Sequence, residues 1–446
     1  MTKPLIVIQG PVATRSGYGN HTRDLALALI KVDKYDIRLV SLPWGITPMN
    51  ALETGNSDHD LLFDRIITAP IERQPDVFIQ VSVPNEFQPV GKYNIGITAG
   101  IETTICNHTW LEGLNKMDTI IVTSEHSKEV FVKTVYDKID EKTKQKAGES
   151  LKLTKPVEVL FEGCDTNVYY KTSDIHKNVA TQISKIKEKF CYLFVGHWLQ
   201  GDIGQDRKDI AMTIRTLCET FKNKASRNRP ALILKTSSAT FSVIDRETIL
   251  TKIRQIVAPY GGTAINIYLL HGDLTDKEMN SLYNHPKIKA MVSFTKGEGF
   301  GRPLLEFTMT GKPVIASAWS GQVDFLHKEY SRLLPGKLTP VHKSAYMKDI
   351  IIEGSQWFTV DYGYAAQVLK DVHDNYKFYE SLGKKQRTYS LENFTLDQMN
   401  EKFVSLVDKG LDTVPQGMQI KLPTLKKVKK AEPPKLKLPK LKKVTT

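Results

Sequence analysis

The sequence predicts an α/β protein of two doubly wound, Rossmann-like domains with a cleft between them, followed by a basic disordered C-terminal tail. Short apolar runs alternate with helical patterns along the chain, which is typical of parallel sheets whose connections are helices. The alternation pauses near residue 163 and restarts near residue 191. A chain of 446 residues is also long enough for two or three domains with sizeable cores.

The first domain is predicted over residues 1–165. Its apolar runs place strands at 5–9, 37–42, 77–81, 93–98, 119–122 and 157–160. Helical patterns occupy about 19–31 and 125–136. We interpret the lysine-rich stretch 137–155 as an exposed excursion and 163–189 as the passage between the domains.

The second domain is predicted over residues 188–390. Strands are expected at 191–195, 231–235, 265–270, 288–294 and 314–316, and helices near 208–221, 245–257, 276–283 and 303–310. A further helical pattern spans about 395–411, within a segment 391–412 that follows the second domain. Doubly wound sheets bind ligands beyond the carboxyl ends of their strands, so the residues there are the candidates for function.

Composition favours a soluble globular protein, with 41% hydrophobic and 25% charged residues. The apolar run at residues 5–8 is too short for a signal peptide or a transmembrane segment. The four cysteines show no CxxC spacing. Disulfides and a zinc site are therefore not expected, and a cytoplasmic location fits.

The basic charge is concentrated in the tail. Ten lysines and one glutamate lie between Lys421 and Thr446, so this segment carries +9 of the net +13 and leaves +4 for the rest. The tail, predicted over residues 417–446, repeats KLPTLKKV as KLPKLKKV after sixteen residues. Prolines and lysine repulsion predict a disordered arm that could bind DNA or another polyanion, or serve only as a solvated tail.

The most informative motif is GEGFGRPLLE at residues 297–306, followed by TGKPVIAS at 310–317. It lies between two predicted strands and joins a glycine turn to the start of a helix. Pro303 suits the first turn of that helix, whose unpaired N–H groups could receive a phosphate. Glu298 precedes the helix and Glu306 lies within it, so the pair could bind hydroxyl groups on either side of a diphosphate. An ordinary βαβ unit with surface carboxylates is the alternative interpretation.

This segment resembles the E-x7-E signature of retaining glycosyltransferases with the GT-B fold, most closely the bacterial and viral family 4. The resemblance implies that Glu298 contacts the donor sugar and Glu306 the nucleotide ribose. It also implies that the amides of Gly299, Phe300 and Gly301 bind the diphosphate. The helix at 391–412 is then expected to cross back onto the first domain.

Other donor-site residues follow from the same resemblance. Lys208 matches a lysine that pairs with the diphosphate, whereas His197 stands where the family has an arginine, a duty that Arg207 could take. Lys235 ends a strand facing the cleft and is a further candidate. Gly17 keeps one glycine of a pair in the first loop of the family, with Ser16 in place of the other.

On the acceptor side, Glu102 closes a strand and is a candidate for orienting the acceptor or assisting its deprotonation. His108 and Trp110 could shape the acceptor pocket, although Trp110 could instead anchor a helix. Asp58-His59-Asp60 spells the D-x-D of metal-dependent glycosyltransferases but lies in a polar stretch, and we interpret it as a solvated loop. No metal and no cofactor beyond the sugar donor is expected.

The sequence thus predicts a retaining, metal-independent glycosyltransferase of the hexosyltransferase type. It would move a sugar from a nucleotide sugar to a hydroxyl acceptor, either a glycan or a hydroxymethylated DNA base. Two alternatives remain open: a nucleotide-sugar 2-epimerase on the same fold, and a non-catalytic nucleic-acid-binding protein that uses its basic tail.

Overall fold

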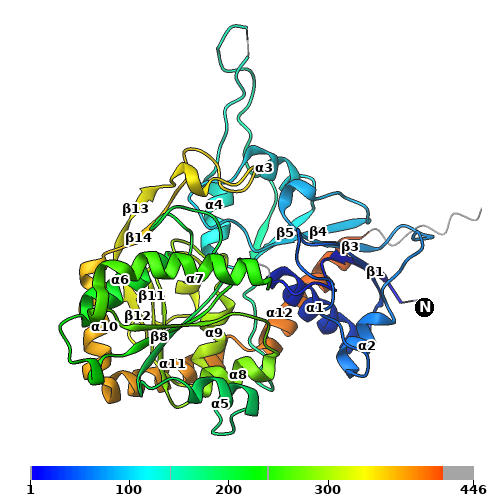
Figure 1. The fold of residues 1–446 in the computed structure, drawn as a ribbon. Coiled ribbons are helices and arrows are strands. Elements are labelled where there is room, and N and C mark those ends of the chain that lie inside the picture. Colours follow the sequence, from blue (N-terminus) through cyan, green and yellow to red (C-terminus); the bar gives the residue numbers. More distant parts are fainter. Residues whose placement is uncertain (1–2, 141, 239–240, 415–446) are drawn as a thin grey trace, which may run out of the picture.

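Two parallel six-stranded sheets form the framework of the protein (Figure 1). The structure is a computed structural model that describes residues 3–140, 142–238 and 241–414. The first sheet has the strand order β2 (Asp36–Ser41), β1 (Leu5–Gly10), β3 (Val77–Val81), β4 (Tyr93–Thr98), β5 (Thr119–Val122) and β6 (Val157–Val159). The second has the order β12 (Arg332–Leu334), β11 (Val314–Ser317), β10 (Ile288–Ser293), β7 (Cys191–Val195), β8 (Ala231–Lys235) and β9 (Asn266–Leu270).

Both sheets are doubly wound. In the first, the chain leaves β1 for β2 and then returns to the other side of β1 to form β3. In the second, it runs from β7 through β8 to β9 and then crosses to the other side of β7 to form β10. The loops that follow β1, β3, β7 and β10 therefore flank the two points where ligands bind in such sheets.

Helices cover both faces of the first sheet. On one face, α1 (Gly17–Lys31), α2 (Ser57–Phe63) and α12 (Leu396–Thr413) pack on strands β1 to β5. On the other, α3 (His108–Leu114) and α4 (Glu125–Lys133) pack mainly on β5. In β5, Ile121 contacts the first group of helices while Ile120 and Val122 contact the second, the alternation expected of a strand buried on both faces.

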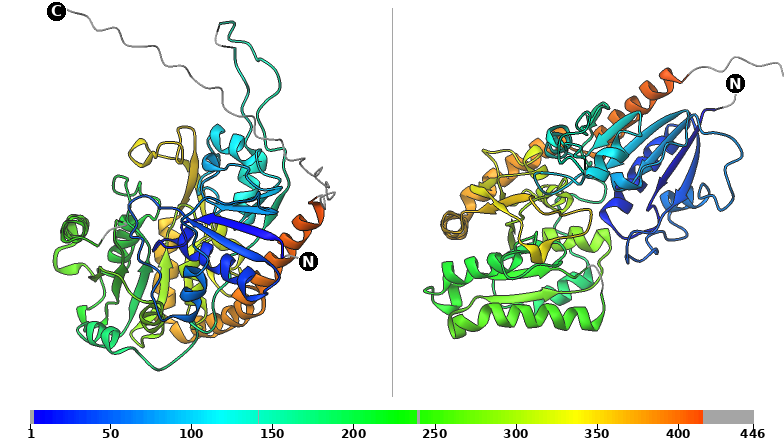
Figure 2. Two further views of the ribbon diagram at one scale, coloured as in Figure 1. Left: turned by 90° about the vertical axis from the view of Figure 1, so that its right-hand side faces the viewer. Right: turned by 90° about the horizontal axis from the view of Figure 1, so that it is seen from above.

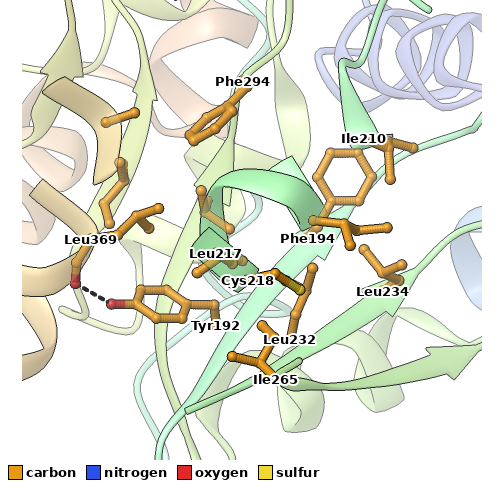
Figure 3. Close-up of a cluster of buried hydrophobic side chains, with 14 of the residues drawn as sticks. Tyr192, Phe194, Ile210, Leu217, Cys218, Leu232, Leu234, Ile265, Phe294 and Leu369 are labelled. Carbon is orange, nitrogen blue, oxygen red and sulfur yellow. Dashed lines mark hydrogen bonds between the residues drawn. The ribbon is translucent and has the colours of Figure 1, made fainter. Parts of the chain in front are cut away.

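The second sheet is covered in the same way. On one face lie α6 (Ile210–Phe221), α7 (Val243–Val257) and α10 (Tyr362–Asp374); on the other lie α5 (Lys177–Ser184), α8 (Asp276–Asn284) and α9 (Arg302–Thr308). Figure 3 shows the first of these cores, in which the hydroxyl of Tyr192 donates to the carbonyl of Leu369 on α10 at 2.6 Å. This hydrogen bond satisfies the only polar atom that the tyrosine side chain brings into the core.

The last helices run back from the second sheet to the first. After α11 (Tyr376–Asn393), α12 packs against α1, β3 and β4, and the large side chains of its buried face are Met399, Phe403 and Val407. Figure 2 shows α12 alongside the strands of the first sheet. Near its start the Leu396 N–H donates to the carbonyl of Cys164, and the Cys164 N–H donates to the carbonyl of Phe394, so two separate segments of the chain form one joint before α12.

Some elements differ from the sequence prediction. The antiparallel pair β13 (Gly336–Pro340) and β14 (Gln356–Val360), the strand β12 and the helices α2, α3, α5, α10 and α11 were not expected. Short 3-10 turns lie at Pro84–Glu86, Ser226–Asn228, Ala258–Thr263, Gly321–Asp324 and Lys343–Ala345. The excursion after α4 protrudes from the body in Figure 1 and is closed on itself by backbone hydrogen bonds between Tyr136 and Leu151.

Candidate functional site

A cavity of about 550 Å³ lies between the two sheets at the carboxyl ends of their strands. Its lining comes from both halves of the chain: the loops after β1, β2, β4 and β6, the start of α1, and the loops after β7, β8, β9 and β10. These include loops at both crossover points described above. The cavity is therefore where the topology of the fold places a ligand.

Nearly all of the residues selected from the sequence line this cavity. They are Gly17, Glu102, Arg207, Lys208, Lys235, Glu298, Gly299, Phe300 and Gly301. They meet there because parallel strands end on the same edge of a sheet, so positions far apart in sequence share one rim.

Glu298 is the centre of an ionic cluster at the junction of the two halves. Lys208 donates to one of its carboxylate oxygens, and Arg207 Nη1 lies 3.3 Å from the other. Its backbone N–H donates to Ser320 Oγ at 2.9 Å. Burial alone would raise the pKa of Glu298, but Lys208 and Arg207 outweigh burial and hold it below its usual range. The carboxylate is thus ionised and fixed in place.

Arg207 joins two carboxylates from opposite sides of the cavity. Its Nη1 lies 3.0 Å from Glu102 Oε1 and donates to the carbonyl of Gly297 at 3.0 Å. Burial would lower the pKa of Arg207, but Glu102 and Glu298 raise it above its usual value. Glu102 therefore orients Arg207, in addition to facing the cavity from the end of β4.

Two further basic groups line the second-half wall. Lys235 Nζ donates to the carbonyl of Gly272 at 2.8 Å and, among the described residues, pairs with no carboxylate. His197 Nδ1 lies 3.2 Å from Ser237 Oγ, and burial followed by the charge of Lys208 lowers its pKa. His197 is therefore neutral near pH 7, so the positive charge on this wall comes from the lysines and Arg207.

Two glycines of the motif allow the loop after β10 to touch the loop after β4. A Cβ placed on Gly297 would lie 2.1 Å from the carbonyl oxygen of Glu102, and one on Gly299 would lie 2.5 Å from that of Ala99. No side chain fits at these distances. Gly297 and Gly299 thus set the contact between the two halves, a role that the sequence analysis did not foresee.

Glu306 is the exception among the predicted residues, because it does not line the cavity in this structure. It lies in the second turn of α9, where it accepts a hydrogen bond from the Tyr283 hydroxyl at 3.2 Å and pairs with Arg302 at 3.2 Å. Burial, opposed by Arg302, raises its pKa to about 7. The i, i+4 spacing places this buried carboxylate beside Arg302 on the same face of α9.

Arg302 is a site residue that the sequence analysis missed. It lines the cavity at the start of α9 and pairs with Asp24 of α1 at 2.8 Å and with Glu162, after β6, at 3.7 Å. Its position inside GEGFGRPLLE was a signal that could have selected it. Its partners Asp24 and Glu162 could not be found from sequence, because they come from the other half of the chain.

The loop after β1 differs from the expected close approach. A Cβ on Gly17 would meet nothing within 4 Å, so this residue faces open space in the cavity. Ser16 caps α1 by accepting a hydrogen bond from the Gly19 N–H at 2.9 Å. The serine that replaces the first glycine of the family pattern thus satisfies a free amide at the start of the helix.

Three other sequence candidates lie away from the cavity. We expected Asp58-His59-Asp60 to lie in a solvated loop, but it is part of α2. The side chain of Asn56 caps this helix, whose polar composition had suggested a loop. Trp110 belongs to α3, and its side chain is buried in the core, where it anchors the helix. His108, at the start of the same helix, is exposed.

Within the part of the chain described, no helix is both long and apolar enough to cross a membrane, and no group of three or more metal-binding side chains is found. The four cysteines are buried and free. The predicted tail lies outside the described residues.

Comparisons with known proteins identify the fold. No protein-family model matches the sequence, and no curated protein matches it. Among solved structures, Anabaena HepE in complex with UDP and glucose matches with a TM-score of 0.59 at 12% identity, covering 91% of this chain and 100% of HepE. Sucrose-phosphate synthase of Thermosynechococcus elongatus matches with 0.59 at 15% identity, over 91% and 99%. A glycosyltransferase of Rickettsia africae matches with 0.60 at 14% identity, over 93% and 100%.

The chain therefore has the GT-B fold, in which two Rossmann-like units face each other across a cleft. At these identities the likeness defines the architecture alone.

Proposed function

We propose that this protein is a glycosyltransferase that moves a sugar from a nucleotide-sugar donor to a hydroxyl acceptor. The observation that carries the proposal is the ionised Glu298, held by Lys208 and Arg207 in the cavity between the two sheets. The solved complexes of HepE with UDP and UDP-glucose, which share the fold, support a nucleotide-sugar donor.

The charges of the cluster suit a diphosphate. Lys208, Arg207 and Lys235 face Glu298 and Glu102, which leaves one unmatched positive charge before a ligand binds. A diphosphate would compete for Lys208, and the exchange would free Glu298 to accept a hydrogen bond from a sugar hydroxyl. Binding of the donor would thus replace the ion pair between Lys208 and Glu298 with two ligand contacts, one from Lys208 to the diphosphate and one from Glu298 to the sugar.

The same cations would assist the chemical step. When the glycosidic bond breaks, the leaving diphosphate gains negative charge, and fixed cations that line the cavity would stabilise that charge. We propose that transfer is retaining and metal-independent, with the departing phosphate helping to take the acceptor proton. Glu306 would reach the ribose only if Arg302 releases it, so this assignment requires the ion pair between Arg302 and Glu306 to break.

We further propose that the protein is a hexosyltransferase of family 4. It would act in the cytoplasm, which would be the cytoplasm of the host if the protein is viral. The resemblance of the 297–317 segment supports the first point.

The direct test is to incubate the protein with a panel of nucleotide sugars, without and then with candidate acceptors, and to identify products by mass spectrometry. Release of free nucleotide from one donor, followed by a glycosylated product, is expected. We also expect activity to survive EDTA, because lysine and arginine supply the positive charge at the site. Loss of activity in EDTA that manganese restores would contradict the metal-independent mechanism.

A further inference from the structure

Two buried polar groups, His21 and Glu162, lie on the first-half wall of the cavity, and within the described part of the chain His21 lacks a hydrogen-bond partner. His21 of α1 is 3% exposed, and neither ring nitrogen has a partner among the described residues. Glu162 is 8% exposed, and its nearest charged partner is Arg302 at 3.7 Å. Both line the cavity. An unpaired buried polar group costs about 1–3 kcal/mol, so such groups mark places where a ligand or a water supplies the missing bond.

An aromatic surface lies on the same wall. The indole of Trp44 stacks on the ring of Tyr18, with centroids 4.1 Å apart and an interplanar angle of 24°. The Tyr18 hydroxyl bonds to Thr98 Oγ1 at 2.9 Å and accepts from the Ala99 N–H at 3.0 Å, which fixes the ring at the end of β4. Trp44 is half-buried and lines the cavity, so it presents a rigid apolar face beside the two polar groups.

We propose that Trp44, His21 and Glu162 form the acceptor subsite, and that the acceptor they receive is a neutral sugar ring. This inference rests on the proposed function. The sugar would lie against the indole of Trp44 while its hydroxyls bond to His21 and Glu162. An apolar platform beside a few convergent polar groups is the usual composition of a site for a small polar ligand.

The charges on this wall argue for a neutral ligand. Burial, together with the nearby charge of Arg302, lowers the pKa of His21 to about 3, so the imidazole is neutral and can both donate and accept. The positive charge of Arg302 is already matched by Asp24, Glu162 and Glu306. Arg15, which also lines the cavity from this half, pairs with Asp273. Among the described residues of this wall, a phosphodiester would therefore meet carboxylates without an unpaired cation, whereas hydroxyls of a sugar would find both donors and acceptors.

The test compares three probes with the full-length protein by saturation-transfer difference NMR, each with and without UDP. The probes are D-glucose, N-acetyl-D-glucosamine and the nucleoside 5-hydroxymethyl-2′-deoxycytidine. The variants are Trp44→Leu, Glu162→Gln and His21→Leu, and the matched controls are Phe378→Leu, an exposed aromatic residue on α11, and Glu401→Gln on α12. Binding of UDP and of UDP-glucose is measured separately by calorimetry.

We expect at least one free sugar to bind the native protein and the controls, and each variant to weaken it by about tenfold or more, a change equivalent to ~1.4 kcal/mol. Thermal unfolding of His21→Leu gives an independent readout. Because the native imidazole has no partner to lose, its melting temperature should stay the same or rise. In the comparison variant His285→Leu, which loses the hydrogen bond from the Lys287 N–H, it should fall.

Four results would overturn the inference: no sugar binds the native protein, the nucleoside alone binds, sugar binding survives in all three variants, or the variants lose affinity for UDP-glucose while they keep it for UDP. The last result would place these residues on the donor sugar. Failure of the native protein to bind UDP would instead contradict the proposed function, and the sugar titrations without UDP would still test this subsite.

Discussion

At the scale of single residues, the pairing of Glu298 with two cations explains how a carboxylate can stay charged while almost buried. The sequence motif located Glu298, and the strand order places Lys208 beside it, since β7 and β10 are neighbours. The position of Lys208 just before α6 could be predicted. The contact of Arg207 with Glu102 could not, because it depends on how closely the two halves approach each other.

Replacing Glu298 with Gln should preserve the fold and reduce donor turnover by about 10²–10³, the usual cost of one lost transition-state contact. The amide keeps the shape of the side chain but cannot neutralise Lys208. Turnover of the donor by mass spectrometry and thermal unfolding by circular dichroism measure the two effects, with Glu401→Gln as the control. Near-normal turnover of the Glu298 variant would contradict the donor-site assignment.

Glu306 should make stability depend on pH. Burial, opposed by Arg302, raises its folded pKa to about 7, above an unfolded value of about 4.3. The folded state therefore binds more protons than the unfolded state between these values. This contribution is fully present below about pH 4, falls as pH rises, and is lost as the pH passes through about 7, with an upper bound of about 4 kcal/mol.

The measurement is urea unfolding of the native protein and of Glu306→Gln across that pH range. We expect the loss of stability with rising pH to be smaller in the variant, because the amide does not titrate. The same slope in both proteins would assign the effect to another group.

At the scale of secondary structure, apolar runs were sufficient to predict the buried strands, whereas the composition of polar segments was not sufficient to predict their helices. The strands β3, β4, β5, β7 and β8 begin and end where the sequence predicts. In contrast, α2 was missed because its polar residues suggested a loop, although Asn56 caps it, and α11 because its exposed face is broad and charged. The short strands β12 to β14 depend on neighbours that the sequence does not show.

The joint before α12 offers a test at this scale. A Cβ on Gly163 would lie 2.5 Å from the Cα of Leu396 and 2.6 Å from the carbonyl oxygen of Thr395. Gly163→Ala should therefore push the start of α12 away from the first sheet and cost about 1–3 kcal/mol. Gly262→Ala is the matched control, since its Cβ would meet nothing within 4 Å. Equal unfolding midpoints in urea for the two variants would contradict a tight joint.

At the scale of the whole molecule, the proposal for the basic tail can be tested without a structure of that segment. Removing the residues after Gln416 deletes ten lysines and one glutamate. If the tail binds DNA, truncation should weaken binding and flatten its dependence on salt, because each phosphate neutralised by a lysine releases a counterion. Fluorescence anisotropy across a salt titration measures both, and donor turnover without acceptor should be unchanged. Equal binding by the two proteins would leave the tail as a solvated appendage.

The backbone contact at Gly297 and Gly299 has a consequence for protein engineering. A fold of two separate halves invites the exchange of one half for that of another protein with the same fold. Here the two halves meet where a glycine of one faces a carbonyl oxygen of the other, at distances that admit no side chain. A chimera would therefore need to inherit the loop after β4 and the loop after β10 as a matched pair, even though one belongs to each parent. Compatibility of the parents would then depend on a few backbone atoms more than on the area of their interface.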